Sequence, residues 1–110
     1  MEMRRLGQVY VFGDFRLDAA RRTLSSREDG RAVPLSTPVF DTLLYLVENA
    51  GALVERTALL AAVWPHVTVV ENSVNQTVSA LRRALGDDPA SPRYVLTVYG
   101  VGYRFAELDE

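Results

Sequence analysis

The sequence predicts an α+β domain in which an N-terminal four-stranded antiparallel sheet precedes three helices and a C-terminal β-hairpin. Three observations support this order. Short stretches of alternating apolar and polar residues occupy the first third of the chain, apolar residues then recur with the period of an α-helix, and a glycine-containing alternating stretch follows. With 110 residues, the chain has the length of one domain with one core.

The composition excludes several classes of protein. There is no cysteine, which rules out disulfide frameworks, thiolate zinc sites and cysteine nucleophiles. No apolar run approaches the roughly 20 residues of a membrane helix, and the N-terminus has no secretory h-region, so we expect a cytoplasmic protein with no membrane contact from this segment. The net charge of −2 argues mildly against nucleic acid as a partner. Whether a nucleic-acid-binding surface exists depends on the local distribution of charge.

The first third is predicted to form strands. Apolar residues on both sides of Gly13-Asp14 indicate a hairpin closed by a two-residue turn. Thr23 to Ser26 and Arg31 to Leu35 flank a second turn signal at Asp29-Gly30, which completes the four strands.

Three helices follow. Thr37 before Pro38 is typical of a helix start, and the apolar stripe predicts a first helix from Pro38 to Asn49. The stretch ERTALLAAVW predicts a short second helix that ends before Pro65. The third is predicted from Glu71 to Leu85 and is closed by glycine. The final RYVLTVYGVGYRF alternates like a strand pair, in which two glycines permit a tight bend.

The third helix has two different faces. At about 100° per residue, its core face is Val74, Val78, Leu81 and Leu85. The other face collects Asn72, Ser73, Gln76, Ser79, Ala80 and Arg83, with Arg82 at the border. Gln, Asn and Arg can pair with base edges in the major groove of DNA, and no carboxylate interrupts this face after Glu71. The alternative is a solvated face whose arginines serve solubility.

The neighbouring elements favour the DNA interpretation. A short helix, a connector and a longer helix follow the helix-turn-helix plan, and the hairpin supplies a wing beside the reading helix. With these motifs assembled, the chain resembles the winged helix-turn-helix DNA-binding domain of the OmpR/PhoB family of bacterial transcription regulators. The motifs are VPLSTPVFDTLLYLVENAG, LVERTALLAAVW, VNQTVSALRRALGDD and PRYVLTVYGVGYRF, in the order and spacing of the family.

The resemblance implies an organisation and a partner. It covers residues 9–105, leaving 1–8 as an N-terminal extension and 106–110 as an acidic tail or the start of a linker. It implies sequence-specific binding of double-stranded DNA, with no cofactor, metal or catalysis, and tandem binding or a homodimer on DNA is the expected arrangement. The early position of the domain resembles the CadC/ToxR-like branch, in which a sensory and often membrane-anchored region follows.

The resemblance and the polar helix face together predict a DNA-binding set. Its members are Trp64, Asn72, Ser73, Gln76, Thr77, Ser79, Ala80, Arg82, Arg83, Thr97, Tyr99 and Tyr103. The loop Pro65, His66, Val67 and Thr68 resembles one that touches RNA polymerase in some members. Two positions of this set depart from the family, as do Val70 and Glu55, which stand where the family usually caps the third and second helices. Many members carry Arg at the wing position of Tyr99, and some place a base-reading arginine at the position of Ala80.

Other interpretations remain open at this stage. Trp64 fits a core position as well as a phosphate contact, and His66 fits a surface loop better than metal ligation because no second ligand is near. A winged helix can also serve as a protein-interaction module, which the acidic balance and Tyr99 favour. An enzyme has no support from any nucleophile–base pair, metal cluster or phosphate loop.

Overall fold

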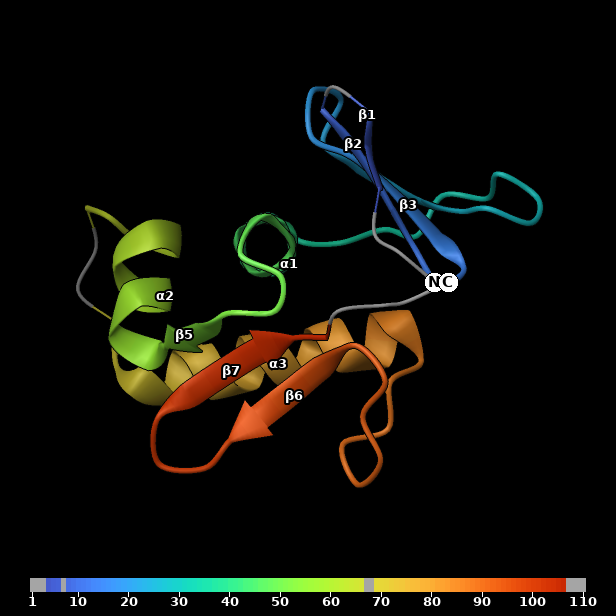
Figure 1. Ribbon diagram of the computed structural model, residues 1–110. Helices are drawn as coiled ribbons and strands as arrows, with labels where there is room; N and C mark the ends of the chain where they lie inside the picture. Colours follow the sequence, from blue (N-terminus) through green and yellow to red (C-terminus); the bar gives the residue numbers. More distant parts are fainter. Residues whose placement is uncertain (1–3, 7, 67–68, 107–110) are drawn as a thin grey trace. The chain divides into compact units, whose positions relative to one another are not determined.

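The structure is a computed structural model, and it describes residues 4–6, 8–66 and 69–106 (Figure 1). The chain divides into two compact units. The first ends at Leu35, and the second is Ser36–Ala106. Each unit is described by itself.

The first unit is a four-stranded antiparallel sheet with the strand order β1-β2-β3-β4. Its strands are β1 (Arg4–Leu6), β2 (Val9–Phe12), β3 (Phe15–Asp18) and β4 (Thr23–Ser26). Phe12 pairs with Phe15, so the β2–β3 loop is the two-residue Gly13-Asp14 turn predicted from the sequence. Gly13 has a φ of 52°, which glycine adopts at little cost.

The four strands of this sheet are not the four that the sequence predicted. Arg31 to Leu35 is not a strand, and its only ladder contact among the described residues is an isolated bridge between Ala32 and Ser25. Val33 still donates its N–H to the carbonyl of Leu24, but the described residues form no further ladder contact beyond it. The fourth strand is instead β1, in the stretch that the sequence assigned to an extension.

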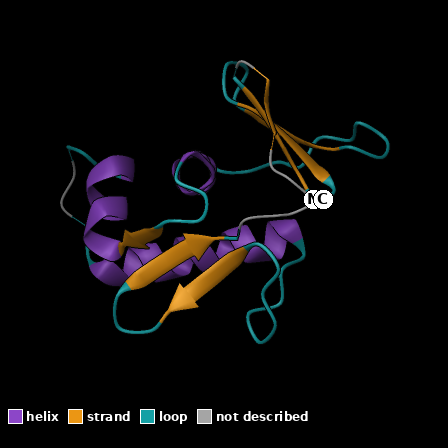
Figure 2. Ribbon diagram, viewed as in Figure 1, coloured by secondary structure: helices purple, strands orange, loops and turns teal. Residues whose placement is uncertain are grey.

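The second unit contains the three helices, drawn in purple in Figure 2. They are α1 (Thr37–Glu48), α2 (Arg56–Val63) and α3 (Glu71–Leu85). Helix α1 begins after Ser36, one residue before the predicted cap, with proline in its first turn. Helix α3 has the predicted bounds, and Gly86 closes it in the left-handed conformation, with a φ of 67°.

The C-terminal hairpin belongs to a three-stranded sheet that the sequence did not predict. Strands β6 (Val95–Val98) and β7 (Gly102–Phe105) form the hairpin, and β5 (Leu53–Glu55) pairs antiparallel with β7. The sheet order is therefore β5-β7-β6, and Figure 1 shows α3 running along this sheet. Strand β5 has only three residues, and its exposed Leu53 is apolar like the buried Val54, so its sequence shows no alternation of apolar and polar side chains.

Gly102 is needed for the pairing of β7 with β5. A Cβ atom at this position would overlap the carbonyl oxygen of Val54 and lie 2.9 Å from the Cα of Glu55. The predicted role of this glycine was to permit a bend. Gly100, with a φ of 77°, does serve the turn, whereas Gly102 allows a close approach of two backbones.

The core of the second unit joins the helices to the sheet. Its fully buried side chains are Leu43, Leu46, Val47, Leu59, Val74, Val78, Leu81, Val95 and Phe105. The predicted core face of α3 is thus confirmed, since Val74, Val78, Leu81 and Leu85 are all buried. No helix among the described residues is long and apolar enough to cross a membrane.

Candidate nucleic-acid interface

The exposed side of α3 is a narrow polar stripe. Asn72, Gln76, Ser79 and Arg83 are exposed, and they fall within roughly 60° of one another around the helix axis. We call these four residues the exposed stripe. Among the described residues none of them has a hydrogen-bond partner within the protein, so their donors and acceptors are available to a ligand.

Three further predicted residues lie beside the stripe. Ser73, Thr77 and Ala80 are half-buried. The hydroxyl of Thr77 donates a hydrogen bond of 2.7 Å to the carbonyl oxygen of Ser73, one turn earlier. This bond consumes the only donor of Thr77 and leaves its oxygen as an acceptor. Ser73 and Ala80 remain at the edge of the surface, where a closely approaching ligand reaches them.

Arg82 does not belong to the exposed surface. It is 9% exposed, and its Nη2 atom donates to the carbonyl oxygen of Val95 and to the Oγ1 atom of Thr97, both at 2.7 Å. Its Nε atom also donates to Val95 at 3.3 Å. The sequence placed Arg82 at the border of the polar face and in the DNA-binding set, and the structure turns its side chain toward β6. Its guanidinium joins α3 to the hairpin.

Thr97 and Tyr103 are likewise engaged inside the protein. Thr97 is half-buried and accepts the bond from Arg82. Tyr103 is 4% exposed, and its hydroxyl donates a short hydrogen bond of 2.6 Å to the Oδ1 atom of Asn75. Both residues form hydrogen bonds to side chains of α3, and their predicted contact with DNA stays a prediction.

Two arginines flank the ring of Tyr103. The Cζ atom of Arg56 lies 5.4 Å from the ring centroid and that of Arg82 lies 5.9 Å from it, distances typical of cation–π contacts. Asn75 receives a second hydrogen bond, from the Nε atom of Arg56 at 3.2 Å. We call Arg56, Asn75, Arg82, Thr97 and Tyr103 the bridging cluster, because it joins α2, α3 and the hairpin.

The turn of the hairpin is the most exposed apolar feature of the second unit. Tyr99 is 89% exposed, and Val101 beyond Gly100 is also exposed. The sequence predicted Tyr99 at the wing tip, and the structure places it in the turn between β6 and β7. It can offer a flat apolar face and one hydroxyl to a ligand, but no charge.

The segment between α2 and α3 contains the remaining predicted residues. Trp64 is half-buried at the C-terminus of α2, where its backbone N–H bonds the carbonyl of Leu60. Pro65 and His66 are exposed. Val67 and Thr68, which complete the predicted polymerase-contact loop, lie outside the described residues.

The sequence interpretation missed Arg56 and Asn75. Arg56 opens α2, and Asn75 lies on the flank of α3 between the core face and the exposed stripe. A signal was present, because a polar residue beside two core valines on an amphipathic helix must find a partner. The partner is 28 residues further along the chain, which periodicity cannot reveal.

Asp87 is a second buried polar group with a structural role. Its carboxylate is 6% exposed and accepts backbone N–H bonds from Arg93, Tyr94 and Val95, the shortest at 2.6 Å. The sequence interpreted Asp87-Asp88 as a helix end and turn. Asp88 does shape the turn, since its Oδ1 accepts the N–H of Ala90. Asp87 additionally fixes the entry into β6.

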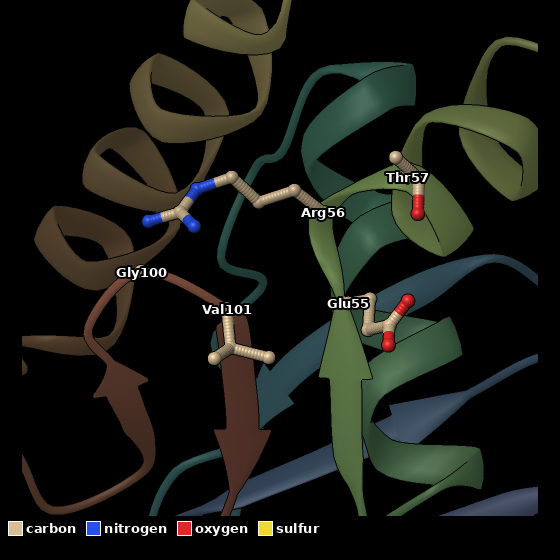
Figure 3. Close-up of a pocket in the computed structure, with 5 residues that line it drawn as sticks. All are labelled: Glu55, Arg56, Thr57, Gly100 and Val101. Atoms are coloured by element: carbon tan, nitrogen blue, oxygen red, sulfur yellow. The ribbon is translucent and has the colours of Figure 1, made fainter.

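An open pocket lies between the start of α2 and the wing turn. It has a volume of about 280 Å³ and is lined by Glu55, Arg56, Thr57, Gly100 and Val101. Figure 3 shows the side chains of Glu55 and Arg56 pointing away from each other. The lining thus includes the guanidinium of Arg56, the carboxylate of Glu55, which points away from that guanidinium, and the backbone of the turn at Gly100.

Comparison with known proteins agrees with this arrangement. Residues 30–105 match the family model described as transcriptional regulatory protein, C terminal. The chain is 38% identical over 96 residues to the transcriptional regulator HilA of Salmonella typhimurium, a match that covers 87% of this chain. The chain spans only 17% of the length of HilA.

Solved structures with the same fold include a DNA complex. The RstA DNA-binding domain of Klebsiella pneumoniae, in complex with the RstA box, superimposes with a TM-score of 0.79 at 35% identity. That match covers 90% of this chain and 97% of the RstA chain. The Thermotoga maritima response regulator DrrB, an OmpR/PhoB homologue, gives a TM-score of 0.81 at 38% identity and covers 90% of this chain and 44% of DrrB.

Proposed function

Because this chain belongs to the family of transcriptional regulatory protein C-terminal domains, we propose that it binds double-stranded DNA sequence-specifically and thereby regulates bacterial transcription. In this proposal α3 lies in the major groove, and the β6–β7 hairpin lies alongside as a wing. The match to the family model coincides closely with the second unit, which holds both elements. The same unit is the winged helix-turn-helix part of the fold.

The exposed stripe is the observation that carries the proposal. Its four side chains supply one hydroxyl, two amides and one guanidinium, and none is occupied by a partner among the described residues. An amide can pair with the N6 and N7 edge of adenine, and a guanidinium can pair with the O6 and N7 edge of guanine. A stripe of this width fits the major groove, which admits a single α-helix.

Base contacts and backbone contacts fall to different residues. We assign Gln76 and Arg83 to base edges, with Ala80 beside them as a small apolar contact. Asn72, Ser73 and Ser79 set the register by hydrogen bonds to phosphate or sugar, with Thr77 as an acceptor and Trp64 offering its indole N–H. Arg82, Thr97 and Tyr103 support α3 and the wing from within, and Tyr99 meets the neighbouring groove edge through its ring.

The decisive experiment is selection of binding sites from a random oligonucleotide pool, followed by an amide-shift titration with the selected duplex. We expect an enriched motif, together with shifts on α3 and in the hairpin turn. A protein-interaction module would enrich no motif, and its α3 amides would stay unchanged on addition of duplex. The exposure of Tyr99 and the net charge of −2 are the features that favour this second candidate.

The wider protein extends the proposal. Since the chain spans a small part of the length of HilA, activation or repression and any contact with RNA polymerase through Pro65 and His66 are properties to test in the whole protein. A single domain buries little DNA surface, so tandem or paired binding at sites about one helical turn apart is the arrangement we propose. Such a domain would act in the cytoplasm, at the chromosome.

A further inference from the structure

Arg56 holds its guanidinium in a fixed position while leaving part of it unused. Its Nε atom donates to Asn75, and its Cζ atom lies 5.4 Å from the ring centroid of Tyr103. A guanidinium carries five N–H donors in a rigid fork. Among the described residues no acceptor bonds either Nη atom of Arg56. Four N–H donors are therefore oriented but available.

The surroundings of this guanidinium favour an anion. Arg56 lines the open pocket of about 280 Å³ together with the wing-turn residues Gly100 and Val101 (Figure 3). The carboxylate of Glu55 points away from the guanidinium, and no ion pair joins the two. A guanidinium that is fixed through its Nε atom still presents its Nη donors, and these can bind a phosphate through two parallel hydrogen bonds.

The location of Arg56 says which phosphate it can reach. On one side it is bonded to Asn75 of α3, and on the other it faces the turn between β6 and β7. If α3 occupies the major groove and the wing lies at the adjacent groove, the strand that separates the two grooves runs between them. That strand presents phosphates, and a cation between the two elements faces it.

We propose that Arg56 binds a DNA backbone phosphate between the two grooves, with Asn75 and Tyr103 as positioning residues that orient its guanidinium. This inference rests on the proposed DNA binding and adds a contact to it. The contact is independent of base sequence, so it sets the register of the domain on DNA and contributes equally at cognate and random sites.

The first test is the salt dependence of binding for Arg56→Gln, measured on a selected duplex and on a random duplex. Losing one phosphate contact should make the log–log slope shallower by about 0.9 and weaken binding to both duplexes by the same factor. Arg16→Gln is the matched control, because Arg16 is an exposed arginine of β3 and its replacement changes the net charge equally. An unchanged slope in folded Arg56→Gln would overturn the proposal.

The second test uses the unmodified protein. The Nε–H signal of Arg56 is assigned by nuclear magnetic resonance from its loss in Arg56→Lys, and a random duplex is then added. We expect this signal to shift. If the α3 amides shift and the Arg56 signal does not, the phosphate contact is wrong while DNA binding stands. If neither shifts, the proposed function itself fails. An equal shift with inorganic phosphate alone would replace the DNA assignment by a free-anion site.

The positioning role has its own spectroscopic signature. Asn75→Ala removes the acceptor of the Arg56 Nε–H bond, so the Arg56 signal in the free protein should move to the position of a solvent-exposed arginine. Affinity for duplex should fall, and the salt slope should stay unchanged because no charge is lost. An unmoved Arg56 signal in Asn75→Ala would contradict the positioning role.

Discussion

At the scale of single residues, position on the helix does not by itself say what a side chain contacts. Arg82 and Arg83 are adjacent, yet Arg83 is exposed and Arg82 is bonded to β6. The helical period placed both residues near the polar face. A side chain at the border of a face can point either to solvent or to a neighbouring element, so the period cannot distinguish the two. What decides is the acceptor at Val95, 13 residues further along the chain. A short-range pattern contains no information about it.

Gln76 tests the reading role of the exposed stripe. Gln76→Ala should cost about 1–3 kcal/mol of binding free energy at the selected site and relax discrimination at one base pair. Fluorescence anisotropy with the selected duplex and its single-base variants measures both effects. Gln8→Ala, at an exposed position of the first unit, is the control. Equal weakening on every duplex would remove Gln76 from the base-reading residues.

Asp87 tests a buried residue with a purely structural role. Asp87→Ala leaves the backbone N–H groups of Arg93, Tyr94 and Val95 without their acceptor, so the free energy of unfolding should fall by about 1–3 kcal/mol or more. Chemical denaturation measures the change. Asp88→Ala, at the exposed neighbour, should cost less than about 1 kcal/mol. Similar losses in the two variants would show that burial of the carboxylate is unimportant.

At the scale of elements, long amphipathic segments were predictable and short ones were not. The bounds of α3 were predicted because 15 residues carry a clear stripe and Gly86 ends it. Strand β5 has three residues and one buried side chain, so only its pairing with β7 reveals it. The predicted strand at Arg31 to Leu35 was wrong, because among the described residues this segment forms only an isolated bridge between Ala32 and Ser25. Strand β1 was missed because it is short and only its pairing with β2 defines it.

Gly102 tests the packing of β5 against β7. Gly102→Ala should lower the free energy of unfolding by several kcal/mol, since Cβ would overlap the backbone of Val54 and close-packed backbones cannot move apart cheaply. Gly100→Ala is the comparison. Its Cβ meets open space, and only the strain of a positive φ opposes it, so the loss should be on the order of 1 kcal/mol. Thermal unfolding of both variants should show this order.

At the scale of the whole molecule, the charge of the chain and the charge of its interface are different quantities. The net charge of −2 argued against a nucleic-acid partner, yet the exposed stripe contains an arginine and no acid. The resemblance identified the family correctly, because four motifs in register depend on the fold as a whole. It gave no indication of the internal hydrogen bonds of Thr97 and Tyr103, two residues that it placed at DNA.

The salt dependence of the whole domain tests the interface. Binding should weaken as salt rises, with a log–log slope of roughly −0.9 for each phosphate neutralised. Arg56 is the one cation that we assign to a phosphate, so we expect a slope of about −0.9 for one domain. Titrations at several salt concentrations measure it. A flat response would contradict the interface, and a much steeper one would point to several domains on one duplex.

Helix α3 carries two kinds of polar side chain, those of the bridging cluster and those of the exposed stripe. Residues that hold α3 to the hairpin, such as Asn75 and Arg82, are engaged inside the protein, whereas Gln76 and Arg83 beside them have no internal bond among the described residues. Replacing the outward pair therefore leaves the scaffold intact. A new operator preference can arise by substitution at those positions alone, without loss of the folded domain.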